Sequence, residues 1–302
     1  MNVALIDVDS HNFPNLCLMK ISAWHKLQGD MVELVKPADI LNGQNLFRQY
    51  DVMYAACVFD WNRETAERLA AVGAIVGGSG TGNKERLEYK VEHIMPDYSL
   101  YGITDTAYGF LTRGCPRRCP FCIVAGKEGA ESRKVADLSE WWDGQKNIKL
   151  LDPNLLAYVG HMNLLEQLAD SGAWVDITQG FDARLLTAAN VDEINRMKIK
   201  YIHFAWDNPR DESIKKNLLF FAERNGLRNR QRLVYVLTNY WSTHEEDLER
   251  VYWLRENGYD PYVMIYDKAK APRETRLLQR WVNNKMVFWS TERFEDFDEK
   301  IA

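Results

Sequence analysis

Short apolar runs of strand length alternate with segments of helical periodicity along most of this 302-residue chain. The run 3–6, for example, is followed by residues 16–27, in which Leu16, Met19 and Ala23 share one helical face. A helix between two strands returns the chain to the starting edge of the sheet, so strands connected in this way pair in parallel. The alternation therefore predicts an α/β protein built on parallel sheets.

The first third of the chain contains four such strands. They are the apolar runs 3–6, 31–35, 52–58 and 74–76, and the last run ends in Gly77-Gly78. Strands that alternate with helices in this number favour a sheet with helices on both faces. We predict that residues 1–95 form a doubly wound, Rossmann-like parallel sheet, with a charged helix at 84–93 that leads toward the second domain.

The alternation resumes after a linker and continues to the end of the chain. Strands are expected at 148–151, 174–178, 200–205, 233–237 and 262–266. A sixth strand is expected directly before the segment that carries Cys115, Cys119 and Cys122. A complete TIM-type barrel has eight βα units. Residues 96–302 are therefore predicted to form a partial (β/α)6 barrel. Helix caps are expected at Asp137, Asn190 and Thr243, each with Glu three residues later.

Three of the five cysteines lie on one short segment, at Cys115, Cys119 and Cys122. Pro116 and Pro120 between them oppose helix formation and keep the segment an open loop. Three thiolates this close can converge on one metal centre, and they suit a 4Fe-4S cluster that keeps one iron open. A structural zinc site would need a distant fourth ligand and remains the alternative. The odd cysteine count argues against a disulfide framework.

The same segment reads Cys-x3-Cys-x-Phe-Cys after an apolar strand end, with Phe121 directly before Cys122. In this it resembles the signature of the radical S-adenosylmethionine (SAM) superfamily. The resemblance implies a radical SAM enzyme, in which a reduced 4Fe-4S cluster held by Cys115, Cys119 and Cys122 cleaves SAM to a 5'-deoxyadenosyl radical. It also implies an electron donor of the flavodoxin or ferredoxin type.

Several predicted strands end in polar residues, and in barrels of this class the chemistry lies at the carboxyl ends of the strands. The resemblance implies that Asp152 holds the amino group of SAM, that Arg184 meets its carboxylate, and that Asp207 or Asn239 bonds the ribose. Phe121 is expected to shield the cluster. The full set of cofactor-binding candidates is Phe121, Asp152, Asn154, Gln179, Asp182, Arg184, Asp207 and Asn239.

The N-terminal domain resembles the cobalamin-binding-like domain that precedes the barrel in one branch of this superfamily. Asp9 and His11 keep two positions of the family motif, Pro14 stands where the motif has glycine, and Gly77-Gly78 matches the later glycine pair. The resemblance implies that His11 can ligate cobalt. A cobalamin-dependent radical SAM methyltransferase is therefore an alternative function. The glycine-rich stretch 77–84 does not match a phosphate-binding loop, because no Ser or Thr follows Lys84.

The substrate stays open between a small molecule, a peptide and a nucleic acid. A formal net charge of −5 gives no general attraction to nucleic acids. Two local basic runs nevertheless provide phosphate-binding side chains, and a non-catalytic module with zinc in the cysteine loop and nucleic acid on these runs is a further alternative. The runs comprise Arg113, Arg117, Arg118, Lys127, Arg133 and Lys134, and then Arg224, Arg228, Arg230 and Arg232.

No apolar run approaches the roughly 20 residues that a membrane-spanning helix needs. The chain begins with a strand-like segment rather than a basic leader and a long apolar core, so we expect no targeting peptide. A cytoplasmic location without membrane partners is expected, and it would keep the thiols reduced.

Overall fold

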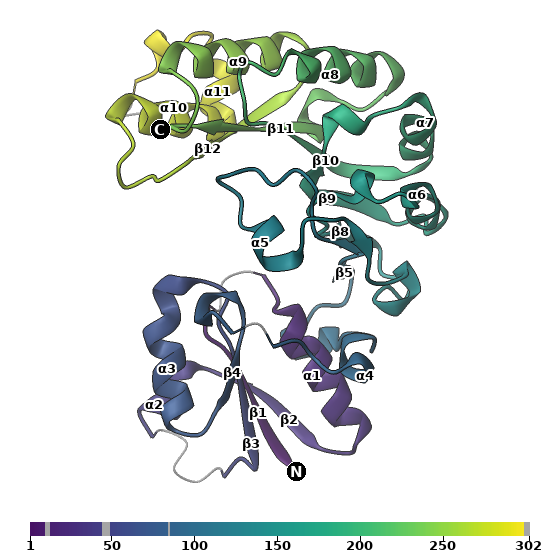
Figure 1. The fold of residues 1–302 in the computed structure, drawn as a ribbon, viewed down its shortest axis with the longest axis vertical. Helices are drawn as coiled ribbons and strands as arrows, with labels where there is room; N and C mark the ends of the chain where they lie inside the picture. Colours follow the sequence, from purple (N-terminus) through teal and green to yellow (C-terminus); the bar gives the residue numbers. More distant parts are fainter. Residues whose placement is uncertain (10–12, 44–48, 84, 299–302) are drawn as a thin grey trace. The chain divides into compact units, whose positions relative to one another are not determined.

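The computed structural model describes residues 1–9, 13–43, 49–83 and 85–298, and it divides the chain into two compact units (Figure 1). The N-terminal unit comprises Met1–Tyr108 together with Ser139–Gln145. The C-terminal unit comprises Gly109–Leu138 and Lys146–Ala302. No described helix is both long enough and apolar enough to cross a membrane.

The N-terminal unit is built on a four-stranded sheet with the order β2-β1-β3-β4. Its three strand pairs are all parallel, which confirms the predicted class of sheet. The order places β1 and β3 side by side at the centre. The connection from β1 leads to β2 at one edge, and the connection from β3 leads to β4 at the other edge. The strands are β1 (Asn2–Asp7), β2 (Met31–Val35), β3 (Val52–Ala56) and β4 (Ile75–Gly77).

Helices cover both faces of this sheet, because alternate residues of β1 carry apolar side chains to opposite sides. Val3 and Leu5 pack in one core cluster with Leu18 of α1. Ala4 and Ile6 pack in another cluster with Leu69 of α3. The helices of this unit are α1 (Leu16–Leu27), α2 (Pro37–Leu41), α3 (Arg63–Ala71) and α4 (Tyr89–Glu92), with 3-10 turns at Asp60–Asn62, Ser79–Thr81 and Tyr98–Tyr101.

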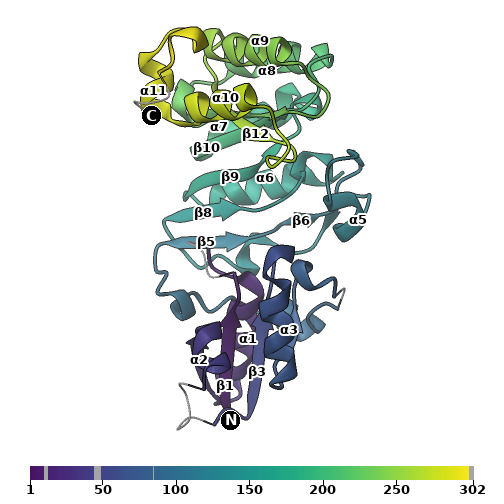
Figure 2. The same ribbon diagram turned by 90° about the vertical axis from the view of Figure 1, so that its left-hand side faces the viewer.

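The second sheet has six strands in the order β12-β11-β10-β9-β8-β5, which follows their order along the chain (Figure 2). All of it except Thr106–Tyr108 of β5 belongs to the C-terminal unit. The four pairs from β8 to β12 are parallel. The carboxyl ends of these strands therefore meet at one edge. The strands are β5 (Thr106–Gly109), β8 (Asn147–Leu150), β9 (Trp174–Phe181), β10 (Lys198–Trp206), β11 (Arg232–Thr238) and β12 (Asp260–Ile265).

The helices that connect β8 to β12 lie along one side of this sheet, and α5 lies on the other side (Figure 1). Phe204 of β10 packs edge-on against Phe221 of α8, with 5.0 Å between ring centroids. Val263 of β12 shares a buried cluster with Leu278 of α10. The helices are α5 (Val124–Glu128), α6 (His161–Asp170), α7 (Ala188–Arg196), α8 (Glu212–Arg224), α9 (His244–Glu256), α10 (Arg273–Asn283) and α11 (Lys285–Ser290).

Among the described residues after β5, short 3-10 turns lie at Leu138–Glu140, Leu155–Ala157, Ala183–Leu185, Asn229–Gln231 and Phe294–Asp296. A small antiparallel pair, β6 (Thr112–Arg113) with β7 (Arg133–Lys134), encloses the cysteine segment.

The predicted α/β class with parallel sheets is confirmed, but several helix boundaries are wrong. The helix expected from Asp137 is only a 3-10 turn, because the Asp137 carboxylate pairs with Lys134 and accepts a hydrogen bond from Gln167 instead of capping. The charged helix expected at 84–93 is limited to Tyr89–Glu92, and residue 84 lies outside the described residues.

The expected cap at Asn190 is also wrong, whereas the one at Thr243 is confirmed. The helix begins earlier, and Thr187 forms a capping box in which Asn190 is the fourth member rather than the first. Thr243 and Glu246 form the capping box of α9 as expected.

Candidate functional site

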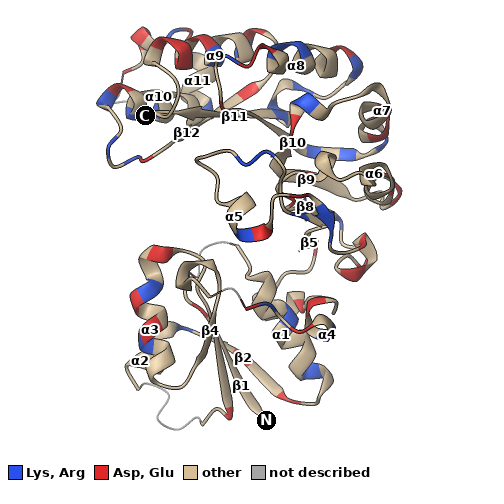
Figure 3. Cartoon of the chain, in the orientation of Figure 1, with Lys and Arg blue, Asp and Glu red and all other residues tan. Residues whose placement is uncertain are grey.

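The cysteine loop follows β5, the edge strand of the six-stranded sheet, and lies within the β6–β7 pair. The backbone N–H of Cys115 donates to Gly129 (3.1 Å), and that of Cys122 donates to the carbonyl of Cys119 (2.9 Å). All three cysteines are free thiols; Cys115 and Cys119 are half-buried and Cys122 is exposed. Positive charge lies along the loop (Figure 3).

Asp152 follows β8 and is bonded to the strand segment that leads into this loop. Its side chain is only 3% exposed. One carboxylate oxygen accepts from Leu111 N–H (2.8 Å), and the other accepts from the N–H (2.7 Å) and the hydroxyl (2.8 Å) of Thr112. Burial raises the pKa of Asp152 to about 7, against the opposing effect of these bonds. The described contacts thus give Asp152 a role in holding the loop entrance.

Asn154, two residues further on, is equally buried and contacts the cysteine loop directly. Its side-chain amide donates to the Cys115 thiol sulfur at 3.5 Å. Its carbonyl oxygen Oδ1 is buried and has no hydrogen-bond partner. A buried acceptor without a partner is costly, so Oδ1 is a position where a ligand donor group would be stabilised.

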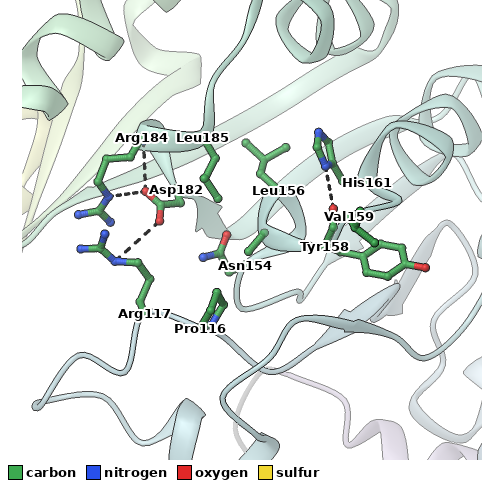
Figure 4. A pocket seen from close by; sticks show the side chains of 11 residues that line it. Pro116, Arg117, Asn154, Leu156, Tyr158, Val159, His161, Asp182, Arg184 and Leu185 are labelled. Atoms are coloured by element: carbon green, nitrogen blue, oxygen red, sulfur yellow. Dashed lines mark hydrogen bonds and ion pairs between the residues drawn. The ribbon is translucent and has the colours of Figure 1, made fainter.

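A cavity of about 450 Å³ lies between the cysteine loop and the ends of β8 and β9 (Figure 4). It brings together three of the predicted cofactor-binding residues, Asn154, Asp182 and Arg184. The lining residues are Pro116, Arg117, Asn154, Leu156, Ala157, Tyr158, Val159, His161, Asp182, Arg184 and Leu185.

Asp182 is the centre of a charged cluster at this cavity. Its carboxylate accepts from Arg184 Nε at 2.6 Å, and Arg117 Nε lies 3.9 Å away (Figure 4). Arg184 also donates through Nη1 to Asp211 at 3.0 Å. Burial alone would lower the pKa of Arg184, but the two carboxylates outweigh it and raise the pKa. The two carboxylates therefore keep Arg184 charged at the cavity wall.

Asp207, at the end of β10, belongs to the same electrostatic environment. Burial raises its pKa, and the charges of Arg184, Arg250 and Arg117 oppose that rise. Burial also raises the pKa of the Cys119 thiol, as does Asp207, while a hydrogen bond from Arg117 lowers it. Asp207 and Arg117 thus both act on one of the predicted cluster ligands.

Gln179, Asn239 and Phe121 do not line the cavity. Gln179 is exposed on β9. Asn239 has a left-handed backbone, with φ of 60°, and donates to the Tyr266 carbonyl at 2.8 Å, so it links the ends of β11 and β12. Phe121 packs edge-on against Tyr240 and Trp241, with centroid distances of 5.4 and 5.5 Å.

Sequence reasoning missed Arg250, which organises the end of β10. This residue of α9 is 2% exposed and donates to the carbonyls of Trp206 (2.6 Å) and Leu237 (2.9 Å), and also to the Asp247 carboxylate. The only signal in the sequence is the spacing of Asp247 and Arg250 on one helical face.

Some of the basic residues noted in the sequence are ion-paired. Arg113 pairs with Glu128 at 2.9 Å, and Lys134 pairs with Asp137 at 2.6 Å. These pairs reduce the positive charge that the first basic run presents.

In the N-terminal unit, His11 lies outside the described residues. Asp9 is buried and accepts from the backbone N–H of Val58 and from the side-chain amide of Asn62 (2.8 Å). Gly78 has φ of 107°, and a Cβ there would lie 2.2 Å from the Cys57 carbonyl oxygen. These contacts fix the loops that follow β3 and β4.

The cysteine loop fits an iron–sulfur cluster in its donor chemistry. Three free thiols on the segment 115–122 are the ligands that such clusters use. Among the described residues, no group of three or more His, Cys, Asp and Glu side chains is gathered tightly enough to hold a metal ion. The cysteine segment therefore matches an iron–sulfur cluster in the type of its ligands and in its short length.

Comparison with known proteins adds no family assignment. No family model matches the chain, and no curated protein matches it.

Proposed function

We propose that this protein is a radical SAM enzyme whose C-terminal unit is a partial (β/α)6 barrel. The observation that carries the proposal is the Cys-x3-Cys-x-Phe-Cys loop after the edge strand of a sequentially ordered sheet, beside a cavity at the strand ends. Sequential order with helices along one side supports the barrel assignment, since a barrel is a sheet of this kind that curves toward closure.

The residues around the cavity support a site for the methionine part of SAM. Asn154 Oδ1 would accept a hydrogen bond from the ammonium group, which removes the cost of its unpaired burial. Arg117 and Arg184 flank Asp182 and would meet the carboxylate. Because Arg184 already bonds two carboxylates, Arg117, with a side chain 40% exposed, is the more available of the two cations. We assign Asp207 to the ribose hydroxyls.

Cys115, Cys119 and Cys122 would hold the 4Fe-4S cluster, which would supply the electron that cleaves SAM to methionine and a 5'-deoxyadenosyl radical. Phe121, in contact with Tyr240 and Trp241, would exclude water from this side of the loop. Asp152 would keep the loop entrance in place through Leu111 and Thr112.

The proposal is tested on protein purified and reconstituted without oxygen. We expect iron and sulfide in the protein and formation of 5'-deoxyadenosine from SAM with dithionite or reduced flavodoxin. Cys119→Ala should abolish both the cluster and the product, whereas Cys17→Ala, which removes an exposed thiol of the N-terminal unit, should retain both.

Two results would contradict the proposal. One is zinc without iron in the anaerobic protein, which would favour a non-catalytic metal-binding module. The other is full retention of iron when all three loop cysteines are replaced by alanine.

A further inference from the structure

The six-stranded sheet has a second face, opposite its helices, and this face carries polar and aromatic side chains. Side chains alternate between the two faces of a strand. Phe204 is buried against Phe221 of α8 on the helix side, and the register pairs Phe204–Val234 and Ile202–Ile177 place Val234 and Ile177 on the same face. The residues beside them in sequence therefore point to the other side. We call the set Lys149, Asp176, His203, Tyr235 and Tyr262, from five successive strands, the open face.

Contacts along the open face join these residues into one row. Lys149 and Asp176 are register partners on β8 and β9. His203 stacks on Tyr235 with 5.0 Å between centroids and 12° between ring planes, and Tyr235 meets Tyr262 edge-on at 5.8 Å. Tyr262 is 38% exposed, so the row runs from a buried carboxylate to an accessible ring.

At the buried end of the row, Asp176 has an oxygen that nothing satisfies. Its Oδ1 is buried without a hydrogen-bond partner, and His203 Nδ1 lies 3.9 Å away, too far for a hydrogen bond. Burial raises the pKa of Asp176, and His203, Lys149 and Lys200 oppose the rise. About a tenth of each of the Asp176 and His203 side chains remains exposed, so the pair is not sealed from solvent.

His203 and Tyr235, the next two residues of the row after Asp176, also present acceptor atoms. His203 Nδ1 lies 2.8 Å from the Ile177 carbonyl, which can only accept, so Nδ1 carries the proton and Nε2 of the neutral ring is an acceptor. Burial lowers the pKa of His203, in keeping with a neutral ring. The Tyr235 hydroxyl donates to the Thr178 carbonyl at 2.7 Å and keeps its oxygen lone pairs.

We propose that Asp176, His203 and Tyr235 form a binding site for a planar group that carries several N–H donors, such as an amidine, a guanidine or an amino-substituted heterocycle. A carboxylate, an imidazole nitrogen and a phenol oxygen together offer acceptors that such a group satisfies. The exposed ring of Tyr262, edge-on to Tyr235, extends the aromatic row beyond these acceptors. That this ligand is the substrate rests on the proposed radical SAM function; the binding site itself does not.

The probe is benzamidine, with benzoate as the counterpart that has the same ring but no N–H donors. Ligand-detected NMR titrations of the full chain should show saturable binding of benzamidine and none of benzoate. Asp176→Asn should weaken benzamidine binding about tenfold or more, the loss expected for one charged hydrogen bond. Asp192→Asn removes the same charge from an exposed position on α7, and it should leave binding unchanged.

A thermal measurement separates a binding role from a structural one. If Asp176 serves a ligand, Asp176→Asn removes a carboxylate whose Oδ1 is buried without a hydrogen bond, and the melting temperature should stay equal or rise. His203→Asn keeps a donor for the Ile177 carbonyl but removes the Nε2 acceptor, so it should weaken benzamidine binding in a folded protein.

Three results would overturn the proposal. They are preferential binding of benzoate, benzamidine binding that Asp176→Asn leaves unchanged, and unfolding of the Asp176→Asn variant, which would make the carboxylate structural. Benzamidine binding should persist when the three loop cysteines are replaced by alanine. The same variant tests cluster formation, so the two proposals fail on different readouts.

Discussion

Gly114, directly before the first loop cysteine, is a position where one methyl group should disturb the whole loop. Its φ is 87°, in the region that favours glycine, and a Cβ there would lie 2.2 Å from the Glu131 carbonyl oxygen. Gly114→Ala should therefore add backbone strain of about 1–3 kcal/mol. Moving the 131 segment away would also weaken the β6–β7 pairing, at about 1 kcal/mol per hydrogen bond. We expect a total destabilisation of about 2–5 kcal/mol, concentrated in the loop.

Gly126→Ala on α5 is the matched control, because a Cβ there meets nothing within 4 Å and its φ is not positive. Alanine in place of glycine in a helix should be neutral or stabilising by up to about 1 kcal/mol. Native-state hydrogen exchange of the metal-free variants measures both effects locally. Equal exchange of residues 112–134 in the two variants would refute the reasoning.

Two further predictions concern buried charges, and both are checked by thermal or chemical unfolding. Burial raises the pKa of Asp152 from 3.8 to about 7, so between these values the folded protein binds a proton that the unfolded chain has released. The stability that this group contributes should thus be lost as pH rises from about 4 to about 7 and regained on acidification. Asp152→Asn should flatten the plot of unfolding free energy against pH in that range. An unchanged slope in the variant would contradict the raised pKa of Asp152. Arg250→Met should destabilise by about 3–5 kcal/mol because it leaves Asp247 buried without its partner, and adding Asp247→Leu should restore much of the loss. If the double variant is no more stable than Arg250→Met, the ion pair is not the cause.

The sequence was sufficient for the class of fold because short apolar runs mark several strands, although β8, β9 and β10 also carry Lys149, Asp176 and His203. Val3 to Ile6, for example, are all fully buried, and such runs are visible without any knowledge of partners. Helix starts were less predictable. Asn190 is a residue type that often caps helices, but Thr187 three residues earlier is the N-cap. Which of the two caps α7 depends on where the helix meets the turn before it.

The candidate site was predictable only in part, for a physical reason. The cysteine spacing is local, so it is readable from the chain alone. The part that Asp152 plays depends on Leu111 and Thr112, about forty residues away, and a carboxylate at a strand end looks the same whether it binds a ligand or a backbone. The acceptor row from Asp176 to Tyr235 depends on strand order and on register shifts between β9 and β10, which no single segment encodes.

The assignment of Ser139–Gln145 to the N-terminal unit has a consequence for dissecting the protein. The polypeptide passes from one unit to the other three times, so no single cut releases two intact halves. A fragment that stops at Tyr108 would lack the Trp141 carbonyl that accepts from Tyr98 (2.5 Å) and the Glu140 carboxylate beside His93 (2.6 Å). Expressing the first unit alone thus calls for a peptide bearing 139–145 to be supplied in trans or spliced onto its end.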